Sequence, residues 1–166
     1  ALAAGILISL THAFSSITLQ ANQVVSGLAL TMLGLGLAGL LGKPYVGTPL
    51  TIKIAAMPVP FLSDIPILGP VLFNRSPFFY LAILLAIGVW FMLEYTLLGI
   101  RIRSAVENPK ATETQGVNVS LVRYLSVIVG GGFSAMAGAH LSTSYSKSWI
   151  EGMTAGRGWI VIALTI

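Results

Sequence analysis

The sequence predicts an all-α fold, a polytopic bundle of membrane-spanning helices. Hydrophobic residues make up 55% of the 166 residues and charged residues only 8%, whereas roughly a quarter of the residues in a soluble domain are charged. Apolar runs recur along the chain, each near the length of about 20 residues that a helix needs to cross the hydrocarbon core. A membrane bundle accounts for both observations.

Four apolar runs and part of a fifth have the length of membrane spans. We expect these spans at about residues 1–19, 24–42, 77–100, 122–142 and, truncated, 156–166. The chain starts without an initiator methionine or a basic leader region, and it stops inside an apolar run. We therefore expect a single transmembrane domain that is a fragment of a longer protein.

The segment between the second and third runs, residues 43–76, is apolar but rich in proline. Seven of the eight prolines fall between residues 43 and 77. A membrane-crossing helix would not tolerate so many kinks and missing backbone donors. We therefore expect an ordered, partly interfacial loop here rather than a span.

A cluster of basic residues indicates the orientation, because cytoplasmic loops carry an excess of lysine and arginine. The cluster follows the third span and consists of Arg101, Arg103, Lys110 and Arg123. We therefore place the loop 101–121 in the cytoplasm. Alternation then places residues 43–76 and 143–157 outside, and residues 20–23 on the cytoplasmic side unless that segment is re-entrant.

Small residues in the fourth run predict a close contact with another helix. They recur at every fourth position in two adjacent rows, Gly130, Ser134 and Gly138 with Gly131, Ala135 and Ala139. Such rows let neighbouring backbones approach closely. They occur in membrane proteins of every function, so they indicate packing rather than a site.

Two glycine-rich stretches match nucleotide-binding patterns only in part. GLGLAG at 34–39 has the spacing of a dinucleotide motif, but it lies inside an apolar run and no acidic residue follows at the required distance. GLLGKP at 39–44 has Leu37 where a P-loop needs its first glycine and Pro44 where a hydroxyl must bind magnesium. We therefore expect any nucleotide to bind on another chain.

The sequence also contains few residues that could bind a metal or catalyse a reaction. The chain has five acidic residues, two histidines and no cysteine, and His12 and His140 are far apart in the sequence. We expect no metal site, no cofactor bound by this chain and no enzymatic activity. A net charge of +4 is too thinly spread for a nucleic-acid-binding surface, so we expect no nucleic acid partner.

Polar side chains within the apolar runs are candidates for function because they are costly at membrane depth. His12 either lines a path or bonds to a neighbouring helix. Asn22 and Gln23 either cap the next helix or belong to a transport site at that helix N-terminus. We expect Glu94 to reach towards the cytoplasmic edge or to pair there, about two turns before Arg101.

The polar stretch between the third and fourth spans carries the signals of a short helix. Asn108 is a strong N-cap residue, Pro109 suits the first helical position, and Gly116 suits the left-handed position that ends a helix. The predicted helix has about seven residues and a length of about 10 Å. Asn118 or Ser120 is then expected to cap the following span.

A helix of this length is marginal by itself in water, so we expect something to hold it. Ala111 and Gly116 are small enough for close approach, and Glu107, Lys110 and Glu113 are available for pairing. The segment therefore either docks into the groove of a partner protein or is a solvated connector. The residues by themselves leave both alternatives open.

Four stretches of the chain together resemble a known family. They are GIRIRSAVENPKATETQGVNVSLVRYLSVIVGGGFSAMAGAHLS, NQVVSGLALTMLGLGLAGLLG, LSDIPILGPVLF and SWIEGMTAGRGWIVIAL. The first looks like the cytoplasmic loop and following helix of ABC-importer permeases of the ribose, nucleoside and branched-chain amino acid type. The others are similar to the subgroup of simple-sugar or nucleoside permeases. The resemblance runs through nearly the whole chain, in the family's order.

This resemblance implies that the short helix is the coupling helix, which sits in a cleft of a separate ATPase subunit. The matching residues are Glu107, Asn108, Pro109, Ala111, Gly116 and Asn118. Thr112 stands where the family often has alanine. The resemblance also places EGMTAGRG at the extracytoplasmic end of the translocation path, with Thr154 as a helix cap and Arg157 as a positive group. Both residues could equally be interfacial anchors.

The residues expected on the translocation path are His12, Asn22, Gln23, Thr154 and Arg157. The resemblance implies a permease for a nucleoside or simple-sugar solute in a prokaryotic plasma (inner) membrane, with ATP-Mg bound by the partner ATPase. Further implied partners are a second permease subunit, an extracytoplasmic solute-binding lipoprotein and membrane lipids. The alternatives are a secondary, ion-coupled transporter and a structural membrane subunit.

Overall fold

The computed structural model describes residues 1–48, 57–58, 74–146 and 148–165. The chain forms two compact units, one of Ala1–Thr51 with Tyr124–Ile166 and one of Ile52–Arg123. In the described part, apart from two short paired strands, the regular elements are helices, so the all-α prediction is confirmed. Most of the proline-rich loop predicted at 43–76 lies outside the described residues.

The first unit is built from helices that occur at both ends of the sequence. These are α1 (Leu2–Ala13), α2 (Gln23–Gly42), α6 (Val119–His140) from Tyr124 onward, and α7 (Arg157–Thr165). Single π-helical turns extend α1 over Phe14–Thr18 and α6 over Leu141–Tyr145. A short 3₁₀ turn, Lys43–Tyr45, extends α2.

The turn between α1 and α2 depends on a side-chain cap. Gln20 adopts a left-handed conformation with φ of 50°, which reverses the chain. The Asn22 Oδ1 atom then accepts hydrogen bonds from the backbone amides of Val24 at 3.0 Å and Val25 at 3.3 Å. These amides have no carbonyl partner within the helix, so Asn22 satisfies them where α2 begins.

Helix α1 packs against α6 through small residues. A Cβ atom at Gly5 would overlap Ala135, and a Cβ atom at Gly131 would overlap the side chain of Ser9. The two backbones therefore approach as closely as the predicted row of Gly131 and Ala135 allows. On its other side α1 contacts α2 through a hydrogen bond between His12 Nδ1 and Ser26 Oγ at 3.1 Å.

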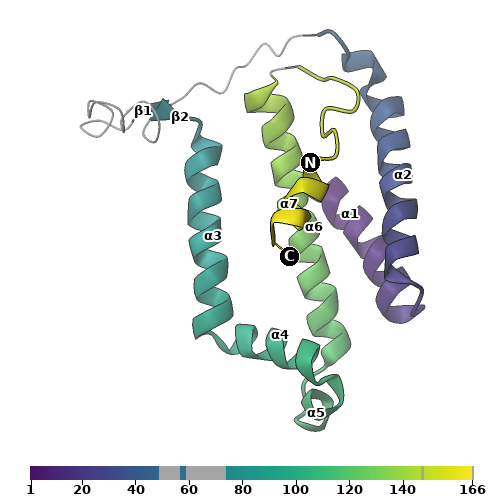
Figure 1. Cartoon of the computed structure of the whole chain (residues 1–166), viewed down its shortest axis with the longest axis vertical. Coiled ribbons are helices and arrows are strands. Elements are labelled where there is room, and N and C mark those ends of the chain that lie inside the picture. Colours follow the sequence, from purple (N-terminus) through teal and green to yellow (C-terminus); the bar gives the residue numbers. More distant parts are fainter. Residues whose placement is uncertain (49–56, 59–73, 147, 166) are drawn as a thin grey trace. The chain divides into compact units, whose positions relative to one another are not determined.

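The second unit contains the charged part of the chain. Its elements are the paired strands β1 (Met57–Pro58) and β2 (Asn74–Arg75), the helices α3 (Pro77–Tyr95), α4 (Leu97–Glu107) and α5 (Pro109–Thr114), and the first turn of α6. Pro77 starts α3 at a position where its missing amide costs nothing. Figure 1 shows the chain turning sharply between α3 and α4.

The run predicted as one span over 77–100 is divided at Thr96 into two helices. Thr96 is extended, with φ of −116° and ψ of 157°. Its hydroxyl donates to the Met92 carbonyl at 2.6 Å, and its oxygen accepts from the Gly99 amide at 3.4 Å. Beyond the break, α4 carries Arg101 and Arg103, whose charges are costly at membrane depth.

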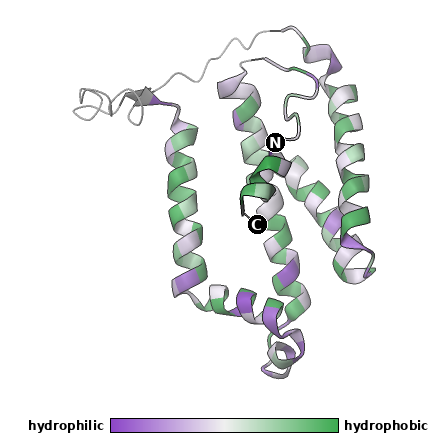
Figure 2. Ribbon diagram, viewed as in Figure 1, coloured by the Kyte–Doolittle hydropathy of each residue, from purple (hydrophilic) through white to green (hydrophobic). Residues whose placement is uncertain are grey.

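Within the residues that the structure describes, three helices are long and apolar enough to cross a membrane. Their extents, with the terminal turns, are Gln23–Tyr45, Pro77–Tyr95 and Val119–Tyr145. The α1 segment Leu2–Thr18 is apolar but shorter. Figure 2 shows hydrophobic residues along α2 and α3, whereas hydrophilic residues are prominent in α4 and α5. The chain is therefore a multi-pass membrane protein.

The contact between α1 and α6 can be tested at two adjacent glycines in the full-length protein. We expect Gly131→Ala to lower the Tm in detergent, because overpacking against Ser9 costs about 1–3 kcal/mol. The control Gly130→Ala meets nothing within 4 Å and gains up to about 1 kcal/mol in helix propensity. Thermal unfolding followed by tryptophan fluorescence would contradict this packing if the two substitutions shifted the Tm equally.

Candidate functional site

Asn108 joins the helices α4 and α5. Its backbone amide donates to the Ser104 carbonyl at 3.0 Å and so closes α4. Its Oδ1 atom accepts from the Ala111 amide at 3.1 Å and so opens α5, with Pro109 as the first helical residue. The predicted capping by Asn108 and Pro109 is confirmed. The helix they open has six residues, Pro109–Thr114.

The C-terminus of α5 is closed by the turn that the sequence predicts. Gly116 has φ of +79°, the left-handed conformation that favours glycine. The Gly116 amide donates to the Glu113 carbonyl at 2.9 Å, and the Val117 amide donates to the Thr112 carbonyl at 3.3 Å. This pair of bonds is a Schellman motif. Asn118 then caps α6, because its Oδ1 accepts from the Leu121 amide at 3.0 Å.

Within α5 only Thr112 is buried, at 3% exposure. Its hydroxyl donates to the Asn108 carbonyl at 2.9 Å, so the threonine that departs from the family pattern has a partner for its polar group. Of the six predicted coupling residues, Pro109 is half-buried and the other five are exposed, namely Glu107, Asn108, Ala111, Gly116 and Asn118. The exposed surface of α5 is therefore mainly polar, and both ends of the helix are held by hydrogen bonds.

Glu94, near the end of α3, forms an ion pair with Arg103 of α4. The sequence led us to expect that Glu94 reaches or pairs near the cytoplasmic edge, with Arg101 as the nearest basic residue ahead of it. Arg101 instead has no ion pair within the described part of the chain. The break at Thr96 turns α4 so that the residue nine positions after Glu94 meets it.

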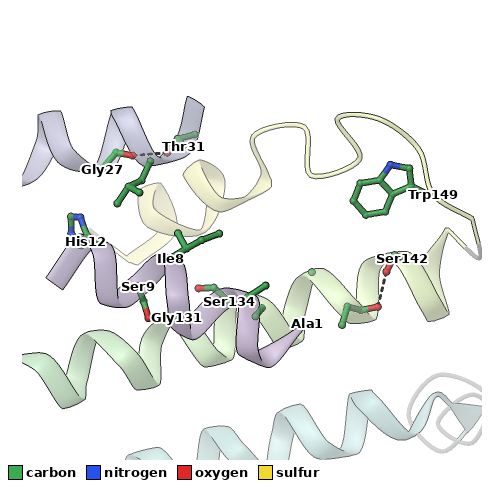
Figure 3. Close-up of a pocket in the computed structure, with 16 residues that line it drawn as sticks. Ala1, Ile8, Ser9, His12, Gly27, Thr31, Gly131, Ser134, Ser142 and Trp149 are labelled. Atoms are coloured by element: carbon green, nitrogen blue, oxygen red, sulfur yellow. Dashed lines mark hydrogen bonds between the residues drawn. The ribbon is translucent and has the colours of Figure 1, made fainter. Parts of the chain in front are cut away.

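A separate cavity of about 730 Å³ lies in the first unit, among α1, α2, α6 and the segment that follows α6. Figure 3 shows Ser9 and His12 of α1, Thr31 of α2 and Ser134 of α6 along it, with Trp149 at one end. Among the residues that the structure describes, none that lines the cavity is an Asp, Glu, Lys or Arg.

Most hydroxyls along the cavity bond to their own helices. Ser9 donates to the Ile6 carbonyl at 2.9 Å, Thr31 to the Gly27 carbonyl at 2.8 Å, and Ser142 to the Ala139 carbonyl at 3.1 Å. These bonds leave the hydroxyl oxygens able to accept a further hydrogen bond. The cavity wall is therefore mainly apolar and offers a few weakly polar groups.

Five residues were predicted to lie on the translocation path, and one of them lines this cavity. His12 lines it and also bonds to Ser26 of α2, so the predicted bond to a neighbouring helix is confirmed, and its role on a path stays a prediction. Asn22 caps α2, and neither Asn22 nor Gln23 lines the cavity. Sequence analysis missed Trp149, which lines the cavity and contacts Gly42, a residue far away in the chain.

The two predicted residues near the C-terminus lie elsewhere. The expected cap at Thr154 is wrong, because α7 begins at Arg157 and Gly156, with φ of 73°, precedes it. The Thr154 carbonyl accepts from the Arg157 amide at 2.8 Å. The Arg157 guanidinium lies 5.0 Å from the centroid of the Tyr145 ring, a cation–π contact. Neither Thr154 nor Arg157 lines the cavity.

A family model described as "Branched-chain amino acid transport system / permease component" matches residues 1–166. The chain is 42% identical over 169 residues to the "Putative glucose ABC transporter permease protein TsgC13" of Haloferax volcanii, which covers 99% of this chain and 51% of that protein. No solved structure is significantly similar to the chain.

Two further relatives are bacterial. The chain is 38% identical to the "Guanosine ABC transporter permease protein NupQ" of Bacillus subtilis, over 100% of this chain and 54% of that protein. It is 34% identical to the "Nucleoside ABC transporter permease protein NupC" of Lactococcus lactis, over 98% of this chain and 52% of that protein. The chain thus spans about half the length of the curated relatives it matches.

The cap of α5 provides a test of how this helix is held. We expect Asn108→Ala to cost about 1 kcal/mol of local stability and to raise amide exchange in α5 about five-fold. Asn108→Ser keeps a capping oxygen and should leave exchange nearly unchanged. Hydrogen–deuterium exchange of the full-length protein measures both variants. Equal exchange in Asn108→Ala and the parent protein would show that the cap does not hold α5.

Proposed function

Because this chain belongs to the family of branched-chain amino acid transport system permease components, we propose that it is part of the membrane-spanning subunit of an ATP-driven importer. It is a multi-pass protein of a prokaryotic plasma membrane. In this proposal the chain carries no nucleotide site and catalyses no reaction itself. ATP-Mg binds to a separate ATPase subunit.

The capped helix α5 is the observation that supports coupling to that ATPase. Both of its ends are fixed by hydrogen bonds, one accepted by the Asn108 side chain and two at the turn around Gly116, although a six-residue helix would be marginal alone. The exposed side chains of Lys110 on α5 and of Glu107 at the end of α4 suit a polar groove in a protein partner. In this proposal α5 lies in the cytoplasm and transmits ATP-driven closure of the ATPase to the membrane helices.

The proposed solute is a nucleoside or a simple sugar. The three relatives are named as permeases for glucose, guanosine and nucleosides. The cavity in the first unit supports an uncharged solute, because the described residues that line it include hydroxyls and His12 but no Asp, Glu, Lys or Arg. A zwitterionic amino acid would leave its charges unpaired in such an apolar wall.

The remaining proposed partners follow from the same family. They are a second permease subunit, identical or not, that completes the translocation path, and an extracytoplasmic lipoprotein that delivers the solute. Within this chain we propose that His12 contributes to the path, and that Asn22, Gln23, Thr154 and Arg157 lie near its ends. We propose no nucleic acid partner for the chain.

Two glycines with the same backbone strain provide a test of the coupling. Gly116 has φ of +79° and Gly47 has φ of +77°, and an added Cβ atom at either position meets nothing within 4 Å. We expect Gly116→Val to abolish solute-stimulated ATP hydrolysis, because it distorts the end of α5. Glu107→Trp should do the same by steric conflict with the ATPase. Gly47→Val, in the predicted outer loop, should retain stimulation.

The measurement uses the full-length permease reconstituted with its ATPase and receptor, with guanosine and glucose tested separately. Normal stimulation in both Gly116→Val and Glu107→Trp would reject coupling through α5. Uptake that follows a proton or sodium gradient without ATP would instead identify a secondary transporter. A complex that transports neither solute with any energy source would favour a structural subunit.

A further inference from the structure

The break between α3 and α4 is a potential hinge on the path from α5 to the membrane. A continuous helix transmits motion because each residue is bonded to the next turn. At Thr96 this pattern stops, and the residue is extended. Motion of α5 would be absorbed at Thr96 unless other contacts hold α3 and α4 in one geometry.

Two local contacts fix the inner side of this break. The Thr96 hydroxyl bonds to the Met92 carbonyl before the break and to the Gly99 amide after it. A Cβ atom at Gly99 would overlap the backbone of Leu93, including its carbonyl oxygen. The first turn of α4 is therefore packed directly against the last turns of α3, with no side chain between them.

The ion pair of Glu94 and Arg103 connects α3 to α4 across the same break, at a residue farther along α4 than Gly99. Arg103 lies almost two turns into α4, so its bond to Glu94 spans α4 well beyond the residues that Thr96 and Gly99 hold. The side chains are 50% exposed at Arg103 and 43% exposed at Glu94. The pair therefore adds little buried surface, and its effect is to restrain the direction of α4 relative to α3.

No flexible linker separates the C-terminal end of α4 from α5. Asn108 is both the last cap of α4 and the first cap of α5. Ala105 is buried at 1% exposure, and its carbonyl accepts a bond from Arg123 Nη2 at 3.5 Å at the start of α6. Between Thr96 and the end of α5, the junction of α4 with α5 and the contact of α4 with α6 are therefore held by hydrogen bonds.

We propose that the Glu94–Arg103 ion pair locks the elbow at Thr96, so that displacement of α5 moves α3 instead of bending the chain. Glu94 and Arg103 are positioning residues in this inference, because they act by holding α4 against α3. The transmission to α3 rests on the proposed function of α5, whereas the rigidity of the elbow does not. The two parts can be measured separately.

The rigidity is measured by the distance between spin labels on α3 and α5 of the full-length protein in nanodiscs. Leu84→Cys and Lys110→Cys are both at exposed positions, and this chain has no other cysteine. Any cysteines outside residues 1–166 are replaced by serine. We expect a narrow distance distribution in the parent protein and a clearly broader one in Glu94→Gln.

Two further variants separate charge pairing from misfolding. The exchange Glu94→Arg with Arg103→Glu restores the pair and should restore the narrow distribution. Arg101→Gln removes a charge from the same helix that has no ion pair in the described part of the chain, so it should leave the distribution narrow. A narrow distribution in Glu94→Gln, or equal broadening in Arg101→Gln, would overturn the inference.

The transmission is measured by ATP hydrolysis in the complex with the ATPase and the receptor. We expect Glu94→Gln to keep ATPase binding and basal hydrolysis but to lose receptor-stimulated hydrolysis several-fold, and the charge exchange to recover it. A broadened elbow with unchanged stimulation would overturn the transmission. A parent protein that binds no ATPase would reject the proposed function, and the label distances would still decide whether the ion pair holds the elbow.

Discussion

Satisfaction of backbone groups at the helix ends is the constraint on which the rest of this structure depends. The first amides and the last carbonyls of a helix have no partner within that helix, so other groups must satisfy them. Asn22, Thr96, Asn108 and Asn118 supply that partner through their side chains where α2, α4, α5 and α6 begin. Each of these caps also marks a change in direction of the chain, so the caps determine where the helices run.

Between these ends the helices are held by close approach rather than by a large apolar core. Within the described residues the buried hydrophobic side chains are the small ones of Ala13, Ala105 and Val119, while long side chains such as Leu84 face outwards. Lipid removes the hydrophobic driving force between helices, so contact between backbones at small residues becomes the main source of packing. The contact of Gly131 with Ser9 is an example, and it leaves room for a cavity beside it.

Local chemistry made α5 predictable from the sequence, whereas tertiary contacts made other features unpredictable. Asn108, Pro109 and Gly116 each have one conformational role that does not depend on distant residues, and the structure assigns them those roles. The break at Thr96 was missed because apolar residues continue to Ile100 and threonine is no strong helix breaker. Trp149 was missed because its contact with Gly42 joins segments more than 100 residues apart, which no local pattern reveals.

The proposed coupling depends on docking of the ATPase on α5. Cysteine crosslinking in the assembled full-length complex tests it most directly, because this chain has no native cysteine and Lys110 is exposed on α5. With a short bifunctional maleimide, Lys110→Cys should form a covalent adduct with the ATPase, and Thr48→Cys, at the start of the predicted outer loop, should form none. An adduct from Thr48→Cys and none from Lys110→Cys would contradict the account.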